Sequence, residues 1–259
     1  MSKSAKFIAA ALSLMVLTAG ANAVTVGSFD STRVLAKRVL NTGADRDALR
    51  GAIADDGHTL ANTTDVLTTG YLNGLDVFYT SVLGFGSSSS VLSAAEQSAL
   101  VNWVSDGGIL LSTGEQPFFR ASYESLLNPF GIDLVGQASA SGSVWSADTT
   151  IALLGNGVAG SLMSDSGTGI LSTGPSTTLA TNNGSVIGLS KSFGSGLVIA
   201  IGDSNFLDDQ LINPAGEQFF RNALNTEIST VPLPAGLPLL LGGMGLLGLA
   251  RMRSNHRKG

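Results

Sequence analysis

Oxygen-bearing side chains follow two apolar runs of the chain, 109–111 and 197–201. Short continuous apolar runs are typical of strands buried on both faces of a parallel sheet. The carboxyl ends of parallel strands meet at one edge, where open α/β proteins bind their ligands. Glu115 would serve there as an acid or base, Asp203 would orient a ligand, and Ser204 would donate a hydrogen bond. The predicted ligand-binding residues are Thr113, Glu115, Asp203, Ser204 and Asn205.

The second of these segments has two other interpretations. Asp203 and Asn205 are residue types that cap backbone groups in turns, and this structural role is the simpler hypothesis. Together with Asp208 and Asp209 they also offer oxygen ligands for calcium. The segment lacks the glycine and the distal glutamate of a calcium loop, so we expect neither a metal nor a cofactor.

Composition excludes several reaction classes. The chain has no cysteine, which eliminates thiol nucleophiles, zinc–thiolate sites and iron–sulfur clusters. It has two histidines, and His256 belongs to the basic C-terminal tail, so a histidine-based triad would depend on His58 alone. The segment Gly84-Phe85-Gly86 is followed by four serines and has no lysine of the kind that a phosphate-binding loop needs. We expect a non-enzymatic protein, and a serine or carboxylate hydrolase is the alternative if Glu115, Asp203 and His58 converge.

Strand-like and helix-like segments alternate through the first half of the chain. Residues 45–55 carry apolar side chains at helical spacing, Gly57 follows as a C-cap, and His58 begins the return. Ser93 and Glu96 form a capping box that begins another helix. We expect further helices at 118–127 and 217–224 and strands at 24–29, 75–81, 109–111 and 197–201. This order predicts an α/β fold with a flavodoxin-like parallel sheet and helices on both faces.

The composition changes between residues 137 and 190, where Gly, Ser, Thr and Ala dominate. Short β-like pieces occur at 144–145, 150–154 and 186–189. We expect a β- and loop-rich insertion that decorates the sheet, and Trp145 in it is a candidate for stacking on a sugar.

The segment from residue 24 to residue 230 resembles the class I glutamine-amidotransferase-like, flavodoxin-like family. The resemblance rests on Gly57-His58, on Trp103 to Gly108 leading into a strand, on Gly202 to Asn205 after the last strand, and on the helix 219–224. Enzymatic members carry a cysteine on a sharp turn after a strand. The comparable turn here, 112–115, has none, so the resemblance implies the fold without the amidotransferase chemistry.

The first 23 residues predict a secretory signal peptide. Two lysines precede an apolar run at residues 7–17, and Ala21 and Ala23 supply a small-x-small cleavage site. Cleavage after Ala23 would make Val24 the new N-terminus and would direct the protein to the Sec export machinery.

The last 29 residues combine a proline motif, an apolar segment at 236–250 and a basic tail at 251–259. The apolar segment is short for a membrane span of about 20 residues. The positive-inside rule places the tail in the cytoplasm. The motif residues are Val231, Pro232, Leu233, Pro234 and Ala235, and the tail cations are Arg251, Arg253, Arg257 and Lys258.

This tail resembles the VPLPA-type, PEP-CTERM-like sorting signals of bacterial proteins processed by exosortases. The resemblance implies an exosortase-type membrane peptidase as a partner. It also implies retention at the inner membrane on the periplasmic side before processing, and then delivery to the cell surface or extracellular matrix. An ordinary C-terminal membrane anchor is the alternative.

Residues 24–230, the predicted domain, contain eight Lys and Arg and nineteen Asp and Glu, a net charge of −11. Phosphate binding needs clustered cations, so nucleic acid is not an expected partner. With export predicted and no catalytic set in the sequence, we expect a binding or structural role at the cell surface. Surface polysaccharide is a candidate partner that only the resemblance to the sorting family implies.

Overall fold

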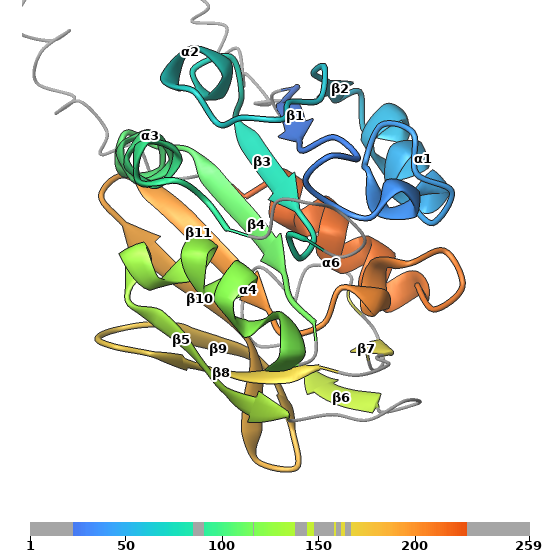
Figure 1. Cartoon of the computed structure of the whole chain (residues 1–259). Coiled ribbons are helices and arrows are strands. Elements are labelled where there is room, and N and C mark those ends of the chain that lie inside the picture. Colours follow the sequence, from blue (N-terminus) through green and yellow to red (C-terminus); the bar gives the residue numbers. More distant parts are fainter. Residues whose placement is uncertain are drawn as a thin grey trace, which may run out of the picture.

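The computed structural model describes residues 23–84, 91–115, 117–137, 144–147, 158, 162–163 and 167–226. Within these residues one sheet has the strand order β2-β1-β3-β4-β11-β10-β9-β6-β7 (Figure 1). Its strands are β1 (Thr25–Ser28), β2 (Thr59–Leu60), β3 (Val77–Thr80), β4 (Ile109–Thr113), β6 (Val144–Ala147), β7 (Leu162–Met163), β9 (Thr177–Asn182), β10 (Ser185–Phe193) and β11 (Gly196–Ile201). A separate antiparallel ribbon joins β5 (Ile132–Gln137) to β8 (Thr168–Ser172).

The first five strands in this order run parallel to their neighbours. The order β2-β1-β3-β4-β11 is that of a doubly wound sheet, in which the winding reverses between β1 and β3. The predicted α/β class with a parallel core sheet is therefore confirmed.

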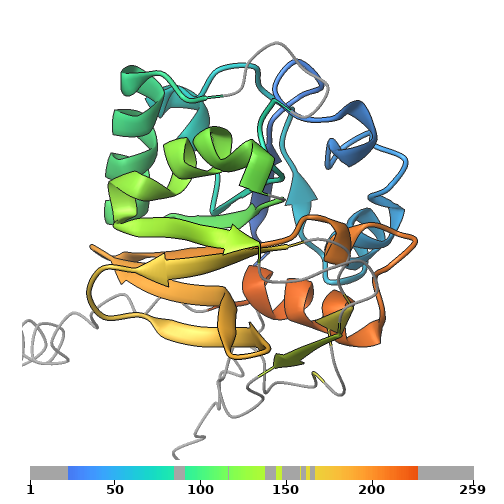
Figure 2. The ribbon, with the colours of Figure 1, turned by 60° about the horizontal axis from the view of Figure 1, so that its bottom comes forward.

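Helices cover both faces of the sheet. The α-helices are α1 (Asp47–Asp55), α2 (Thr69–Leu72), α3 (Ala94–Ser105), α4 (Arg120–Leu127) and α6 (Pro214–Leu224). Figure 2 shows α3 and α4 on one side of the sheet and α6 on the other. Tyr79 and Leu111 pack into the core under α1 and α6, whereas Phe78 and Leu110 pack into the core under α2, α3 and α4. Successive side chains of one strand thus enter opposite cores, which explains the continuous apolar runs.

Local sequence signals set the ends of α3. The Ser93 side chain accepts a hydrogen bond from the Glu96 amide, and the Glu96 carboxylate accepts one from the Ser93 amide, so the predicted capping box is present. The helix ends before Gly107, whose φ of +124° is accessible to glycine without strain. A Cβ on Gly108 would lie 2.3 Å from the Trp103 ring, so the chain can turn tightly only with glycine there.

The described part of residues 137–190 differs from the expected decoration, because β10, β9, β6 and β7 continue the main sheet with antiparallel pairing. The turn between β9 and β10 is made by Asn183 and Gly184, with φ values of 48° and 81°. Asn-Gly is the preferred pair for a two-residue hairpin turn. The expected strand at 150–154 lies outside the described residues.

Both chain ends lie outside the description as well, including residues 1–22 of the signal peptide, the sorting motif, the apolar segment 236–250 and the basic tail. In the ranges given above, no helix is both long enough and apolar enough to cross a membrane.

Candidate functional site

The predicted site residues converge at the carboxyl edge of the sheet. Thr113 ends β4 and is paired with Ile201, the last residue of the neighbouring parallel strand β11. Glu115 lies two residues beyond β4. Asp203 and Ser204 follow β11, and Asn205 begins the 3₁₀ helix η4 (Asn205–Leu207). All five side chains are buried. The topology therefore brings together what the sequence had only placed after two separate strands.

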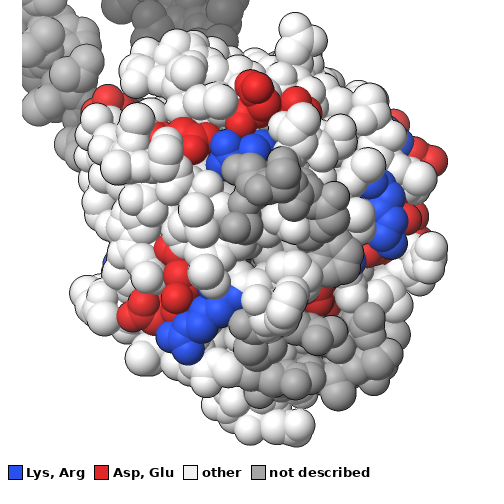
Figure 3. All heavy atoms as spheres, in the orientation of Figure 1, with Lys and Arg blue, Asp and Glu red and all other residues white. Residues whose placement is uncertain are grey.

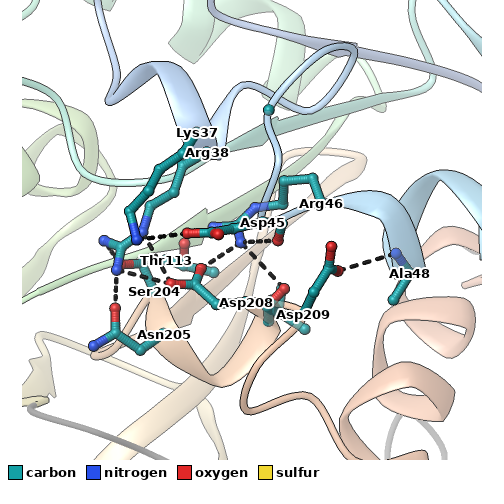
Figure 4. Close-up of polar contacts among 12 residues, drawn as sticks. Lys37, Arg38, Asp45, Arg46, Ala48, Thr113, Ser204, Asn205, Asp208 and Asp209 are labelled. Carbon is teal, nitrogen blue, oxygen red and sulfur yellow. Dashed lines mark hydrogen bonds and ion pairs between the residues drawn. The ribbon is translucent and has the colours of Figure 1, made fainter.

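Arg38 lies at the centre of this edge (Figure 4). It ends the 3₁₀ helix η1 (Ala36–Arg38), in the connection between β1 and α1, and is 5% exposed. Its Nη1 donates to Glu115 Oε2 at 2.9 Å and to Ser204 Oγ at 2.5 Å, while its Nη2 donates to Asn205 Oδ1. Its Nε and Nη2 donate to Asp208 Oδ2 at 3.2 and 3.0 Å. One guanidinium thus joins the segments that follow β4 and β11.

A second arginine completes the network. Arg46 is fully buried and donates through Nε to the Tyr79 hydroxyl at 3.1 Å and through Nη1 to Asp208 Oδ1. Nη1 also donates to the Leu207 carbonyl oxygen at 3.1 Å. Burial lowers the pKa of Arg46, but Tyr79 and Asp208 act in the opposite direction and the pKa is raised overall. Arg46 therefore stays charged beside Asp208.

In this network the two arginines meet the carboxylates of Glu115 and Asp208. Ser204 Oγ donates to Glu115 Oε2 at 3.1 Å and accepts from Arg38, so its hydroxyl links the two ionised groups. Chemically, the arrangement presents a serine hydroxyl beside a carboxylate. Both are held by a cation and buried beneath the surface.

One of the predicted residues, Asp203, has the structural role that the sequence suggested, and Thr113 also contacts the backbone. The Asp203 carboxylate accepts a hydrogen bond from the Asn205 amide at 2.8 Å. This contact is an Asx turn, the backbone-capping role expected for Asp203. Thr113 Oγ1 donates to the carbonyl oxygen of Thr80 on β3 at 3.4 Å. These contacts shape the strand ends around Arg38.

The Asp208-Asp209 pair is engaged by the protein itself. Asp208 binds both arginines, and the carboxylate of Asp209 accepts the amides of Asp47 and Ala48 at 2.8 and 3.0 Å, where it caps α1. Within the described ranges no cluster of three or more acidic or histidine side chains could hold a metal ion. The calcium interpretation of this segment finds no support in these contacts.

His58 does not join the carboxylates. It precedes β2, whose first residue pairs with Thr25 at the start of β1, so His58 lies at the amino edge of the sheet. Its Nδ1 accepts the Val24 amide at 3.3 Å. Glu115 and Asp203 lie at the opposite edge, so the convergence that a histidine-assisted hydrolase requires does not occur.

Arg38 and Arg46 were not among the residues predicted from the sequence. A compositional signal was present, since five of the eight cationic residues of residues 24–230 lie between Arg33 and Arg50. In an acidic domain with few cations, such a local concentration marks a segment that pairs with carboxylates, but it does not indicate which carboxylates these are. Figure 3 shows the same scarcity on one face, where the basic side chains lie beside acidic ones.

Comparisons with known proteins show a likeness in fold to several solved structures. No protein family model matches the chain, and no curated protein matches it. Among solved structures, the N-terminal domain of mmIFT52 has a TM-score of 0.61 at 15% identity, covering 81% of this chain and 99% of that one. Cytoplasmic protein STM3548 from Salmonella typhimurium has a TM-score of 0.54 at 13% identity, covering 69% and 85%. Cytoplasmic protein STM1381 from Salmonella typhimurium LT2 has a TM-score of 0.56 at 14% identity, covering 77% and 97%. At such identities the likeness extends to the fold alone.

Proposed function

We propose that this protein is exported and sorted by an exosortase-type system to the cell envelope or extracellular matrix, where it has a non-catalytic binding or structural role. Its domain would be a flavodoxin-like core of the class I glutamine-amidotransferase-like type without the nucleophile. The signal peptide and the VPLPA-type tail support the destination, and the strand-end network supports the non-catalytic role.

The observation that carries the non-catalytic role is the position of Arg38. Open α/β sheets bind ligands beyond the carboxyl ends of their strands. In this chain Arg38 occupies that place, and its guanidinium engages Glu115, Ser204 and Asp208. The hydrogen-bonding groups that would meet a substrate are thus used within the protein.

Surface polysaccharide is the partner we propose for the exposed surface. Phe118 is 87% exposed, so its ring is accessible to a sugar. The net charge of −11 over residues 24–230 favours a neutral or cationic polymer over a polyanion.

Matrix pull-down with a matched pair of variants tests this partner. Phe118→Ala should reduce retention on isolated exopolysaccharide several-fold, whereas Val66→Ala, which also removes an exposed apolar side chain, should leave it unchanged. Equal retention of both variants would count against a stacking role for Phe118. The same assay on Trp145→Ala tests the aromatic residue that the sequence suggested.

Cell fractionation tests the destination most directly. The full chain should reach the cell surface, and a chain ending at Thr230 should be exported without being sorted there. Pro232→Ala/Pro234→Ala, which changes the motif and keeps the apolar segment and the tail, is the matched control for anchoring. Unchanged surface delivery of the truncated chain would overturn the sorting proposal. Surface retention of the motif variant would indicate an ordinary anchor.

A hydrolase is the second candidate function, because Ser204 Oγ lies 3.1 Å from Glu115 Oε2. A serine-directed fluorophosphonate probe should label the protein if Ser204 is a nucleophile, and Ser204→Ala should abolish the labelling. We expect no labelling, because Arg38 and Glu115 hold the hydroxyl in a buried network.

A further inference from the structure

The first strand of the sheet begins within one residue of the predicted cleavage site. Ala23 is exposed, whereas the side chain of Val24 packs against the core under α1 and α6. The Val24 carbonyl oxygen accepts the Thr59 amide at 2.9 Å, which begins the ladder between β1 and β2. Of the two residues that flank the predicted cleavage site, Ala23 is thus exposed and Val24 is anchored.

The backbone nitrogen of Val24 has a buried side chain as its hydrogen-bond partner. It donates to His58 Nδ1 at 3.3 Å, and the His58 side chain is 6% exposed. The His58 amide donates to the Ile53 carbonyl oxygen at 2.9 Å, which ties the residue to the C-terminus of α1. Because Nδ1 accepts this hydrogen bond, the ring proton is assigned to Nε2.

We propose that His58 binds the free α-amino group of the mature protein, created by cleavage between Ala23 and Val24. The proposal rests on the proposed export, since the leader peptidase of that pathway would perform the cleavage. Water supplies the hydroxyl that leaves with the Ala23 carboxylate and the proton that the Val24 nitrogen gains. The new amine takes up a second proton at neutral pH and becomes an ammonium group.

Cleavage changes the strength of the contact with His58. Before cleavage Val24 offers one neutral amide proton, and afterwards it offers an ammonium group to the same imidazole nitrogen. Charge-assisted hydrogen bonds are about twice as strong as neutral ones. A carboxylate is placed one residue away, because Asp76 Oδ2 accepts the Thr25 amide at 2.7 Å. The amino edge of the sheet thus suits a cationic chain end.

A double-mutant cycle tests the contact independently of export. Four proteins are compared by urea unfolding: chains that begin at Val24 or at Ala23, each with His58 or with His58→Leu. Retaining Ala23 moves the ammonium group by one residue and restores a neutral amide at Val24. We expect this extension to raise the unfolding equilibrium constant roughly three- to tenfold with His58 present and by a smaller factor in His58→Leu, where only the attraction to Asp76 remains. An equal effect in both backgrounds would overturn the proposal.

A second measurement needs no substitution. The ¹⁵N chemical shifts of the His58 ring in the chain beginning at Val24 should report a neutral imidazole protonated at Nε2. A proton on Nδ1 would exclude Nδ1 as the acceptor and overturn the proposal even if His58→Leu fails to fold.

Mass spectrometry of the protein recovered from cells separates this proposal from the export proposal. A mature chain beginning at Val24 is the expected result. An exported chain that begins elsewhere would overturn the role of His58 and leave export standing. A chain retained in the cytosol with its leader intact would overturn export and the processing that depends on it.

Discussion

The guanidinium of Arg38 lies between two buried carboxylates, Glu115 and Asp208, and Asp208 also pairs with Arg46. Glu115 follows β4 and Asp208 follows η4, so the pairing joins segments that share no local hydrogen-bonding pattern. Removing one partner of a buried pair leaves an uncompensated charge, which costs more than the pair contributes when intact. This network should therefore contribute to the stability of the segments that follow β4 and β11.

Arg38→Met should lower the free energy of unfolding by about 3–5 kcal/mol, because Glu115 would remain buried without its cation. The control is Arg120→Met, which breaks an exposed i,i+4 pair with Glu124 and should cost about 0–1 kcal/mol. Urea denaturation of both variants measures the difference. Equal losses would show that the strand-end network contributes no more than a surface pair.

The carboxylate of Glu96 makes part of the stability depend on pH. Burial would raise its pKa, but hydrogen bonds from Ser93, Arg33 and Leu67 lower it overall. A group with a lowered pKa contributes stability above its unfolded value of about 4.3, and this contribution is lost as the pH falls through the folded value.

Glu96→Gln should therefore destabilise the protein by about 2 kcal/mol at pH 7, and the difference from the parent should shrink as the pH falls below about 4. Urea unfolding between pH 3 and pH 7 measures this convergence. Glu124→Gln, which breaks only the exposed pair with Arg120, is the matched control. A loss that stays constant over the whole range would contradict the assigned role of the ionised carboxylate.

At the scale of elements, the helices and buried strands were predictable where their signals are local. The helix α6 begins at Pro214, earlier than the expected residue 217, because Asn213 caps it by accepting the Gly216 amide at 2.9 Å and Pro214 suits the first position. The elements β2 and α2 were missed because two and four residues are too few to show a periodicity.

Two glycines should respond in opposite ways to substitution by alanine, because one is closely packed and the other lies in open space. A Cβ on Gly202 would lie 1.9 Å from the Thr168 carbonyl oxygen, so Gly202→Ala should force β11 away from β8 and cost about 3 kcal/mol or more. Gly51 lies exposed within α1 with open space around it, so Gly51→Ala should stabilise by about 1 kcal/mol. Thermal unfolding should move the two midpoints in opposite directions. A stable Gly202→Ala variant would contradict the close approach.

At the scale of the whole molecule, two cores share one sheet. The side chains of β3, β4 and β11 alternate between the core under α1 and α6 and the core under α2, α3 and α4. Neither face can lose its helices without exposing the apolar side chains of the strands between them. The described domain should therefore unfold as one cooperative unit.

Leu100→Ala and Phe219→Ala test this coupling, because each removes a buried side chain from a different core. Each should lower the stability by about 2–5 kcal/mol, and both should shift one transition without changing its slope against urea. Their effects should add in the double variant, since the two sites lie on opposite faces of the sheet. A second transition in either variant would show that the cores unfold separately.

Features whose causes lie within a few residues could be predicted from the chain alone. The capping box of α3, the glycine that ends it, the doubly buried strands and the α/β class all follow from local spacing and composition. The processing signals at the two ends are also linear patterns, and they remain predictions. The hairpin of β9 and β10 belongs to the same group, because its Asn-Gly turn is visible in the sequence.

The presence of Arg38 and Arg46 at the strand ends, in contrast, is known only from the folded chain. Arg38 lies 77 residues from Glu115 and 170 from Asp208, and no pattern along the chain links residues at such separations. Folding selects these contacts because a buried charge is tolerated only beside an opposite one, and the topology determines which carboxylates are within reach. The topology also places His58 against the start of β1 rather than beside Glu115 and Asp203.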